Sequence, residues 1–283
     1  MTSDSIYSFA VLRNRLTISG TLVALSGLRI GSGRSSDVGG SDLPVLRDAR
    51  GRPFIPGASL KGALRARVES LLAAVHPNEV RSLQEIEAHQ QLITKIKNET
   101  KNLKDDDERS RRIWAQSTLI ELTFGAQWTA SRLFFKDAPV DEDLWFGQFE
   151  VRNGVGIDRD TETVSGSLLY DYEVVPAGTS FRFDLVVENA APWQLGMITL
   201  ALKPWERGEA QIGGFRSRGL GYVRLDTTTR RYHQLNTVDD LIAMLDDSGS
   251  ADVEDAQLTA WRAAFRAVLS DPSQAHSEEA HDA

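Results

Sequence analysis

The sequence has no cysteine, which excludes disulfide bonds and zinc sites built on thiolates. It has no apolar run long enough to cross a bilayer. Its first residues, Met-Thr-Ser-Asp-Ser, lack the basic stretch and apolar core of a secretory signal. With 41% hydrophobic residues in 283, the chain can still bury a substantial core. We therefore expect a globular protein of the cytoplasm with no membrane partner.

Histidine is scarce, and the five histidines follow no metal-binding spacing. Two lie near the end of the chain and the others are far apart, so surface positions are the simplest interpretation. We predict no metal site made from protein ligands alone. The histidines are His76, His89, His233, His276 and His281.

An excess of positive charge is also absent, since the net charge is −8. This sign would argue against a nucleic-acid partner, but the charge is unevenly distributed. Residues 234–283 hold eleven acidic and two basic side chains, whereas residues 1–233 hold 30 basic and 29 acidic ones. Basic side chains dominate in 1–75 and again in 211–233. We therefore predict a basic surface assembled from both ends of the body.

The most informative stretch runs from Gln211 to Gly221 and places four glycines and two arginines in eleven residues. Glycine permits positive φ and the close approach of another molecule. Arginine presents a planar fork of donors that suits phosphates. Such a loop can hold the backbone of a nucleic acid, although an ordinary glycine-rich turn between strands has a similar composition.

One amphipathic helix is clear between Ser59 and Leu72, where apolar residues recur at spacings of three and four. Ser59 follows Pro56-Gly57 and is a suitable N-cap. Lys61 and Arg65 are four residues apart near the helix start, where cations gain nothing from the helix dipole. An anion bound between them and the free N–H groups would explain this placement. A solvated helix face is the alternative.

The pattern of apolar residues predicts an alternation of strands and helices. The first strand is expected to bend or bulge at Gly20, and Trp114 and Trp128 are expected to lie in the core. The order of elements predicts an α+β fold related to the ferredoxin-like type. Strands are expected at 15–30, 131–138, 170–175, 180–188 and 222–225, and helical segments at 113–124 and 193–203.

The chain is predicted to divide at residue 236. Residues 1–236 form the main domain, with an inserted helical lid at 78–113 and an extended hairpin at 154–170. Residues 237–283 form an acidic helical C-terminal extension, whose end at 271–283 is expected to be disordered.

Three segments, in this order, closely resemble the RAMP superfamily of CRISPR-associated proteins. They are Gly39-Gly-Ser-Asp-Leu-Pro-Val-Leu-Arg-Asp48, Phe54-Ile-Pro-Gly-Ala-Ser-Leu-Lys-Gly-Ala-Leu-Arg65 and Gly213-Gly-Phe-Arg-Ser-Arg-Gly-Leu-Gly221, together with Gly156-Ile-Asp-Arg159. The resemblance covers about residues 15–225 and is greatest to the repeating backbone subunit of type III effector complexes. It implies that residues 1–236 form a modified RNA-recognition-motif palm with a β-hairpin thumb. The insertion at 78–113 and the acidic tail are longer than the family core.

The resemblance implies that copies of the subunit stack along a guide RNA, with each thumb displacing one nucleotide. The hairpin Asp158–Leu168 takes the thumb position. The implied partners are guide CRISPR RNA, target RNA, and other RAMP and large-subunit proteins of the complex. Asp158 and Arg159 could instead form a structural ion pair. The residues expected at the RNA are Ser59, Lys61, Arg65, Asp158, Arg159, Gly213, Gly214, Arg216, Ser217, Arg218 and Gly219.

In target-cleaving members of the family, an aspartate before a Pro-Val or Pro-Ile strand carries RNA cleavage, and Asp42 takes that position. The implied reaction depends on a divalent metal and uses the ribose 2′-OH as nucleophile. One carboxylate cannot fill the shell of an ion, so we expect Mg²⁺ assembled together with RNA phosphates. Asp37 lies in the same loop and could assist. The alternative for Asp42 is a local Asx turn before Pro44.

Three functions remain at this point. The first is a guide-binding backbone subunit that cleaves target RNA through Asp42. The second is a non-cleaving structural subunit of the same complex. The third is an endoribonuclease that processes guide precursors. That enzyme would need an acid–base pair near the glycine loop, for which only Tyr222 and His233 are candidates, so it ranks last.

Overall fold

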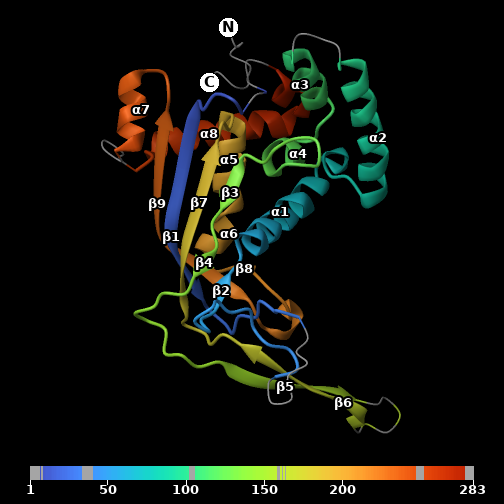
Figure 1. The fold of residues 1–283 in the computed structure, drawn as a ribbon, viewed down its shortest axis with the longest axis vertical. Helices are drawn as coiled ribbons and strands as arrows, with labels where there is room; N and C mark the ends of the chain where they lie inside the picture. Colours follow the sequence, from blue (N-terminus) through green and yellow to red (C-terminus); the bar gives the residue numbers. More distant parts are fainter. Residues whose placement is uncertain are drawn as a thin grey trace.

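A five-stranded antiparallel sheet forms the centre of the protein (Figure 1). The computed structural model describes residues 7, 9–33, 41–101, 106–157, 160, 162, 164–246 and 252–277. The strands lie in the order β3-β7-β1-β9-β8. They are β1 (Asn14–Ala24), β3 (Leu133–Phe135), β7 (Ser180–Glu188), β8 (Ala210–Gln211) and β9 (Tyr222–Gln234).

The succession of elements confirms the predicted α+β class. Helix α1 (Gly57–Ala73) follows β1, and α5 (Pro192–Ala201) follows β7. With β3 and β9 this gives the β-α-β-β-α-β order of ferredoxin-like folds. The helix predicted at 193–203 is therefore present, and the short α6 (Lys203–Glu206) continues it.

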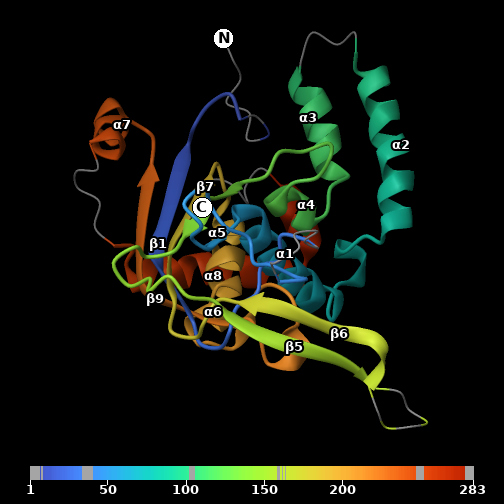
Figure 2. The ribbon, with the colours of Figure 1, turned by 60° about the horizontal axis from the view of Figure 1, so that its bottom comes forward.

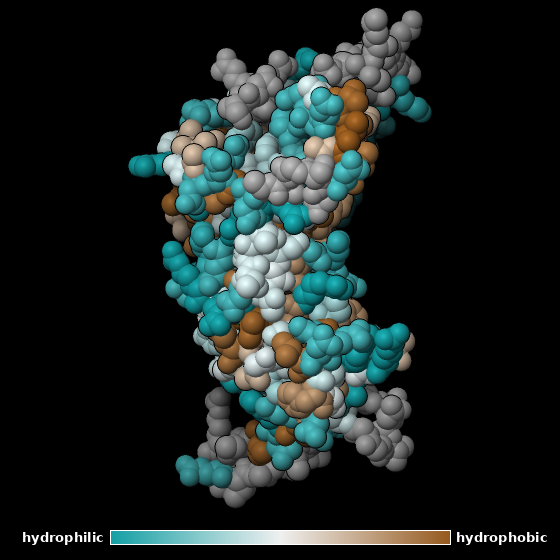
Figure 3. Space-filling view, turned by 90° about the vertical axis from the view of Figure 1, so that its left-hand side faces the viewer, coloured by the Kyte–Doolittle hydropathy of each residue, from teal (hydrophilic) through white to brown (hydrophobic). Residues whose placement is uncertain are grey.

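The central strand β1 follows the predicted alternation. Leu16, Ile18 and Leu22 are fully buried, because side chains two residues apart share one face of a strand. The register with β9 shifts between Ser19 and Thr21, which confirms the expected bulge at Gly20. The strand ends at Ala24 rather than at residue 30. Figure 3 views the molecule from the side of β9 and α7 (Val238–Leu245), where hydrophilic and neutral residues predominate and apolar patches are small.

The acidic C-terminal part, predicted as an extension from residue 237, packs on the rest of the body. Helix α8 (Asp255–Ser270) packs on α5, and its Trp261 and Phe265 belong to the main core. In Figures 1 and 2, α8 lies behind the sheet together with α5. The close approach depends on Gly196 of α5, where a Cβ atom would overlap the carbonyl oxygen of Trp261.

The disorder expected at 271–283 is wrong for its first half. A 3₁₀ helix, η3 (Pro272–His276), follows α8. Ala275 is fully buried, and its carbonyl oxygen accepts a hydrogen bond from the indole N–H of Trp114 at 3.4 Å. Trp114 is a core residue as predicted, whereas Trp128 is only partly buried. Residues 278–283 lie outside the described part.

The predicted insertion consists of helices that stand beside the sheet (Figure 1). The stretch 113–124 was predicted as one helical segment. It forms parts of two helices, α3 and α4, which are separated by the non-helical residues 116–118. Gly125 ends α4 with φ 85°. No helix among the described residues is long and apolar enough to cross a membrane. The elements are η1 (Pro77–Glu79), α2 (Leu83–Glu99), α3 (Asp106–Ala115) and α4 (Leu119–Phe124).

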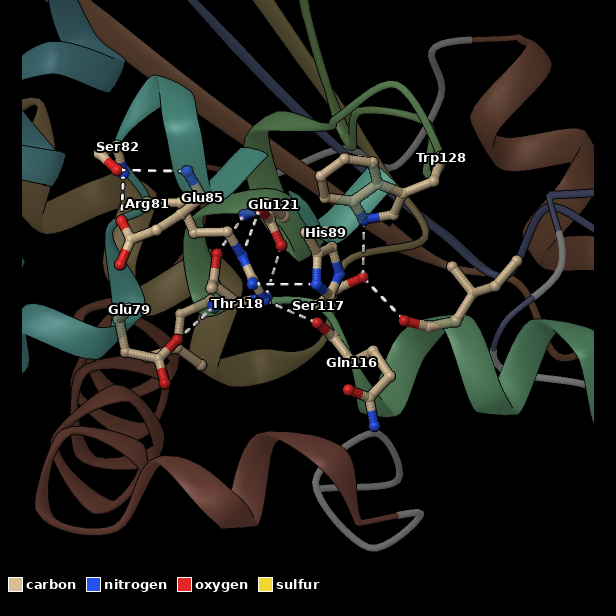
Figure 4. A network of polar contacts seen from close by, with 12 residues as sticks. Glu79, Arg81, Ser82, Glu85, His89, Gln116, Ser117, Thr118, Glu121 and Trp128 are labelled. Atoms are coloured by element: carbon tan, nitrogen blue, oxygen red, sulfur yellow. Dashed lines mark hydrogen bonds and ion pairs between the residues drawn. The ribbon is translucent and has the colours of Figure 1, made fainter. Parts of the chain in front are cut away.

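A polar network fastens the root of this insertion to the body (Figure 4). Arg81 donates from Nε to Glu121 at 3.0 Å and from Nη2 to the Gln116 carbonyl oxygen at 2.8 Å. Its Nη1 lies 3.0 Å from Nδ1 of His89, a buried side chain on α2. Ser82 caps α2 through a reciprocal capping box, and Thr118 caps α4 in the same way. The predicted lid is thus anchored at its base.

A long two-stranded hairpin projects from the lower end of the molecule (Figures 1 and 2). Its strands are β5 (Glu150–Ile157) and β6 (Val164–Val174), which pair antiparallel. It is longer than the predicted hairpin of 154–170. Asp158 and Arg159, between the two strands, lie outside the described residues. A second small sheet pairs β2 (Phe54–Ile55), which directly precedes α1, with β4 (Ala138–Pro139).

Candidate nucleic-acid interface

A shallow groove of about 540 Å³ brings together motifs from both ends of the body. Each of the three sequence motifs contributes a residue to its lining, namely Leu43, Ser59 and Gly213. Asp42 directly precedes Leu43. Asp37 lies outside the described residues. The full lining is Arg29, Ile30, Gly31, Gly33, Leu43, Ser59, Gly213 and Gly214.

The glycine–arginine loop, Gly213–Gly221, reaches the groove because its first residue has no side chain. Gly213 has φ 86°, and a Cβ atom there would overlap the carbonyl oxygen of Arg29. The next residue, Gly214, donates its N–H to the same oxygen at 2.9 Å. Glycine is therefore required at position 213 to seat the loop against the chain that continues from β1.

The exposed turn of this loop, η2 (Arg216–Arg218), lines an open hollow of about 870 Å³ together with Tyr222. Within the described part of the chain, the Arg216 side chain makes no hydrogen bond or ion pair. Arg218 donates from Nη1 to the Tyr170 hydroxyl at 2.6 Å, and this bond raises the pKa of Arg218. Ser217 and Gly219 lie in the same hollow. The loop thus presents two exposed cations, as predicted.

Phe215 holds the loop to the hairpin and to the N-terminal segment. Its ring contacts the guanidinium groups of Arg29 and Arg218, whose Cζ atoms are 5.0 and 4.9 Å from the ring centre. Tyr172 packs edge-on against the same ring at 4.8 Å. Partial burial lowers the pKa of Arg29, against the opposing influence of Tyr172. Sequence reasoning missed Arg29, Phe215 and Tyr172, although the basic N-terminal region pointed toward Arg29.

Asp42 is exposed and forms a reciprocal pair with Asp171 of β6. The Asp42 N–H donates to Asp171 Oδ1 at 2.6 Å, and the Asp171 N–H donates to Asp42 Oδ2 at 3.1 Å. The Ser41 hydroxyl donates to the same Asp171 oxygen at 2.8 Å. The bond from the Asp42 N–H, with that from Ser41, holds the pKa of Asp171 below its usual range. The Asp42 carboxylate is therefore bonded across to β6 rather than in a local Asx turn.

The stretch Ser41–Arg47, called the Asp42 segment here, contacts β6 through one isolated β-bridge and through side chains. Leu43 pairs in parallel with Tyr172, and the Glu173 N–H donates to the Leu43 carbonyl oxygen at 3.1 Å. The Glu173 carboxylate accepts from the Val45 N–H at 3.0 Å and pairs with Arg47 at 2.7 Å. Sequence reasoning found the strand at 170–175 but not this docking, whose only signal is the alternation of acidic and aromatic residues in Tyr170-Asp-Tyr-Glu173.

Helix α1 begins at Gly57, so Ser59 lies inside the helix and is not its N-cap as predicted. Pro56 takes the cap position without a side-chain bond. The first N–H, that of Gly57, donates to the Asp137 carboxylate at 2.8 Å, so an acidic group of the protein already faces this helix start. Ser59 lies in the first turn and lines the groove.

Lys61 and Arg65 are not part of the groove lining. Arg65 pairs with Glu69 at 2.7 Å and donates to the Gly125 carbonyl oxygen at 3.0 Å, so its guanidinium is engaged within the protein. Partial burial, and next the charge of Arg65, lower the pKa of Lys61. RNA contact by these two residues stays a prediction. Arg67, which the sequence reasoning passed over, shares a hollow of about 340 Å³ with Arg216.

The two candidates for an acid–base pair are far apart. Tyr222 and His233 lie at opposite ends of β9, which places them roughly 35 Å apart at the usual rise per residue. Tyr222 lines the hollow of the glycine–arginine loop, whereas His233 lines a different one on the sheet. This separation removes the acid–base pair on which a guide-processing enzyme would depend.

Comparison with known proteins gives one family match over most of the chain. The sequence model of the RAMP superfamily matches residues 21–224. A protein of Methanocaldococcus jannaschii named "CRISPR system Cms endoribonuclease Csm3" is 42% identical over 59 residues, which are 20% of this chain and 24% of that protein. A protein of the same name from Mycobacterium tuberculosis is 51% identical over 53 residues, 18% of this chain and 22% of that protein. The aligned part thus spans about a quarter of these relatives.

Proposed function

Because this chain belongs to the RAMP superfamily, we propose that it is a guide-RNA-binding backbone subunit of a type III CRISPR effector complex that cleaves complementary target RNA. The observation that carries this proposal is the groove, which unites the segments around Leu43, Ser59 and Gly213. The relatives named as endoribonucleases support its cleavage part. In this proposal, other RAMP subunits and a large subunit are the protein partners.

The guide backbone lies along the glycine–arginine loop in this proposal. Arg216 and Arg218 supply exposed positive charge, and the main chain at Gly213 and Gly214 allows close approach. Contacts with phosphates fix the position of a strand without reading its sequence. The guide bases then remain available to pair with a target.

Target cleavage is assigned to Asp42. One oxygen of its carboxylate, Oδ2, is held by the Asp171 N–H, and within the described residues Oδ1 accepts no hydrogen bond. Oδ1 can therefore accept a hydrogen bond from a ribose 2′-OH and orient it for in-line attack on the adjacent phosphorus. The 2′-oxygen forms a cyclic 2′,3′-phosphate, and the P–O bond to the next nucleotide breaks. The 2′-OH proton is lost, and the departing 5′-oxygen takes up a proton.

A divalent ion fits this site only as an ion shared with RNA. The described residues contain no group of three His, Cys, Asp or Glu side chains that could hold a metal. Mg²⁺ commonly keeps several waters and binds one or two carboxylates plus substrate phosphates. Asp42 would provide the protein ligand, and the bound ion would supply charge stabilisation at the attacked phosphate.

The test is Asp42→Ala in the assembled complex with Mg²⁺ and complementary RNA. Loss of a group that orients or deprotonates the nucleophile is expected to slow single-turnover cleavage by about 100-fold or more. Target affinity should stay unchanged, because the proposed contact acts on the reacting hydroxyl. Chelation of Mg²⁺ should stop cleavage by the wild-type complex and leave guide binding intact.

The matched control is Asp48→Ala, which removes a nearby aspartate that pairs with Arg52 at 2.8 Å. This variant should cleave at the wild-type rate. Unchanged cutting by Asp42→Ala would remove Asp42 from the mechanism. A wild-type complex that binds target without cutting it would instead support the non-cleaving structural subunit.

A further inference from the structure

We propose that Asp171 is the positioning residue of the cleavage site and that it sets the Asp42 carboxylate from the root of the β5–β6 hairpin. This inference rests on the proposed role of Asp42. Asp171 itself is not assigned a contact with RNA or metal. It acts through the main chain and the side chain of Asp42.

The geometry is a closed ring of two hydrogen bonds. The Asp171 carboxylate holds the Asp42 N–H at 2.6 Å, and the Asp171 N–H holds Asp42 Oδ2 at 3.1 Å. Together these bonds fix both the backbone at position 42 and the orientation of its carboxylate. The oxygen that is not held, Oδ1, is then the one presented to a substrate.

The Ser41 hydroxyl gives the ring a second anchor, since it donates to the same Asp171 oxygen at 2.8 Å. One oxygen of Asp171 therefore accepts two bonds from consecutive residues of the Asp42 segment.

The side chains of β6 alternate between two tasks. Asp171 and Glu173 hold the Asp42 segment, whereas Tyr170 and Tyr172 contact Arg218 and Phe215 of the glycine–arginine loop. Successive residues of a strand point to opposite faces, which explains this division. The hairpin root therefore connects the proposed guide grip to the proposed cleavage residue.

The decisive variants are Asp171→Ala and Asp171→Asn, measured in the assembled complex. Asparagine keeps an Oδ1 acceptor for the Asp42 N–H and the Ser41 hydroxyl but removes the charge. Alanine removes the acceptor. A small displacement of a catalytic group is expected to lower the single-turnover cleavage rate by about 10- to 100-fold for Asp171→Ala. Asp171→Asn should cleave within about three-fold of the wild-type complex, because the hydrogen bonds rather than the charge do the positioning.

The other readouts separate positioning from a structural or metal-binding role. Guide affinity, target affinity and the Mg²⁺ concentration for half-maximal rate should match wild type in both variants. Equal loss in the alanine and asparagine variants would overturn the inference, because it would point to the charge. Loss of guide binding would overturn it too, because the role would then be structural.

Ser41→Ala keeps the test decisive if Asp171→Ala does not fold. It removes one of the two donors and should give a smaller decrease in rate. A wild-type rate in Asp171→Ala, or in Ser41→Ala where Asp171→Ala does not fold, would refute the inference and leave the proposed function standing. Cleavage by Asp42→Ala, in contrast, would refute the proposed function itself.

Discussion

At the scale of single residues, Arg216 and Arg218 are the strongest predicted phosphate ligands. Both are exposed at the turn of the loop, and Arg224 on β9 offers a matched arginine that pairs with Asp226 at 2.7 Å. Arg216→Ala with Arg218→Ala should weaken guide binding. The slope of log affinity against log salt should flatten by about 0.7 for each phosphate of the single strand that no longer meets an arginine.

The measurement is guide affinity over a range of salt concentrations. Arg224→Ala is expected to keep the wild-type affinity and slope. If the double variant also keeps both, the loop does not hold phosphates. A single Arg218→Ala would in addition break the bond to Tyr170, so comparison with Arg216→Ala separates loss of charge from loss of loop position.

The residues that the sequence revealed are those whose neighbours along the chain form a pattern. The glycines and arginines of residues 213–221 are one example, and Asp42 before Pro44 is another. Asp171 was not predicted as a site residue, because its partner Asp42 is 129 positions away and no periodicity links the two. The contact of Phe215 with Arg29 was not predicted for the same reason. Contacts over such separations depend on the tertiary fold.

At the scale of elements, Gly196 decides how closely α5 and α8 pack. Gly196→Ala should destabilise the protein by about 1–3 kcal/mol, because the added methyl group overlaps the Trp261 carbonyl and the helices must separate. Urea unfolding and thermal melting check this. Gly62→Ala is the control, since Gly62 is an exposed helical glycine whose Cβ would meet nothing. Alanine there should stabilise α1 by up to about 1 kcal/mol. Equal stability of the two variants would contradict this packing argument.

Element types were predictable from sequence, whereas element ends were less so. The bulge at Gly20 and the stop at Gly125 follow from local backbone requirements and were located correctly. The N-cap of α1 was placed three residues too late, at Ser59 instead of Pro56, because Asp137 from a distant segment satisfies the first N–H. The break before α4 was missed, because Thr118 begins a new capping box within an apolar stretch. Each error arose where a tertiary or capping contact overrode the periodic pattern.

At the scale of the whole molecule, apolar residues join the C-terminal region to the body. The region was predicted as an acidic helical extension, and Leu258, Trp261 and Phe265 of α8 belong to the main core. Helix α7, which carries two aspartates and no basic residue, lies toward the opposite end of the molecule from the β5–β6 hairpin (Figure 1). These acidic side chains are thus kept away from the proposed RNA-binding surface, where Arg29 lines the groove and Arg216 and Arg218 line the neighbouring hollow.

The final prediction concerns the end of the chain. Removing residues 271–283 deletes the buried Ala275 and the hydrogen bond that its carbonyl oxygen accepts from the Trp114 indole N–H. Loss of this bond and of the buried methyl group is expected to cost about 1–2 kcal/mol, which lowers the melting temperature by several degrees. Removing only 278–283 deletes three acidic residues and none of the described contacts, and should leave the melting temperature unchanged. Guide affinity should be similar in both truncations, because η3 contacts Trp114 and lines neither the groove nor the hollow of the glycine–arginine loop. Equal melting temperatures would show that η3 contributes nothing to stability, and a large gain in affinity would show that the tail competes with RNA.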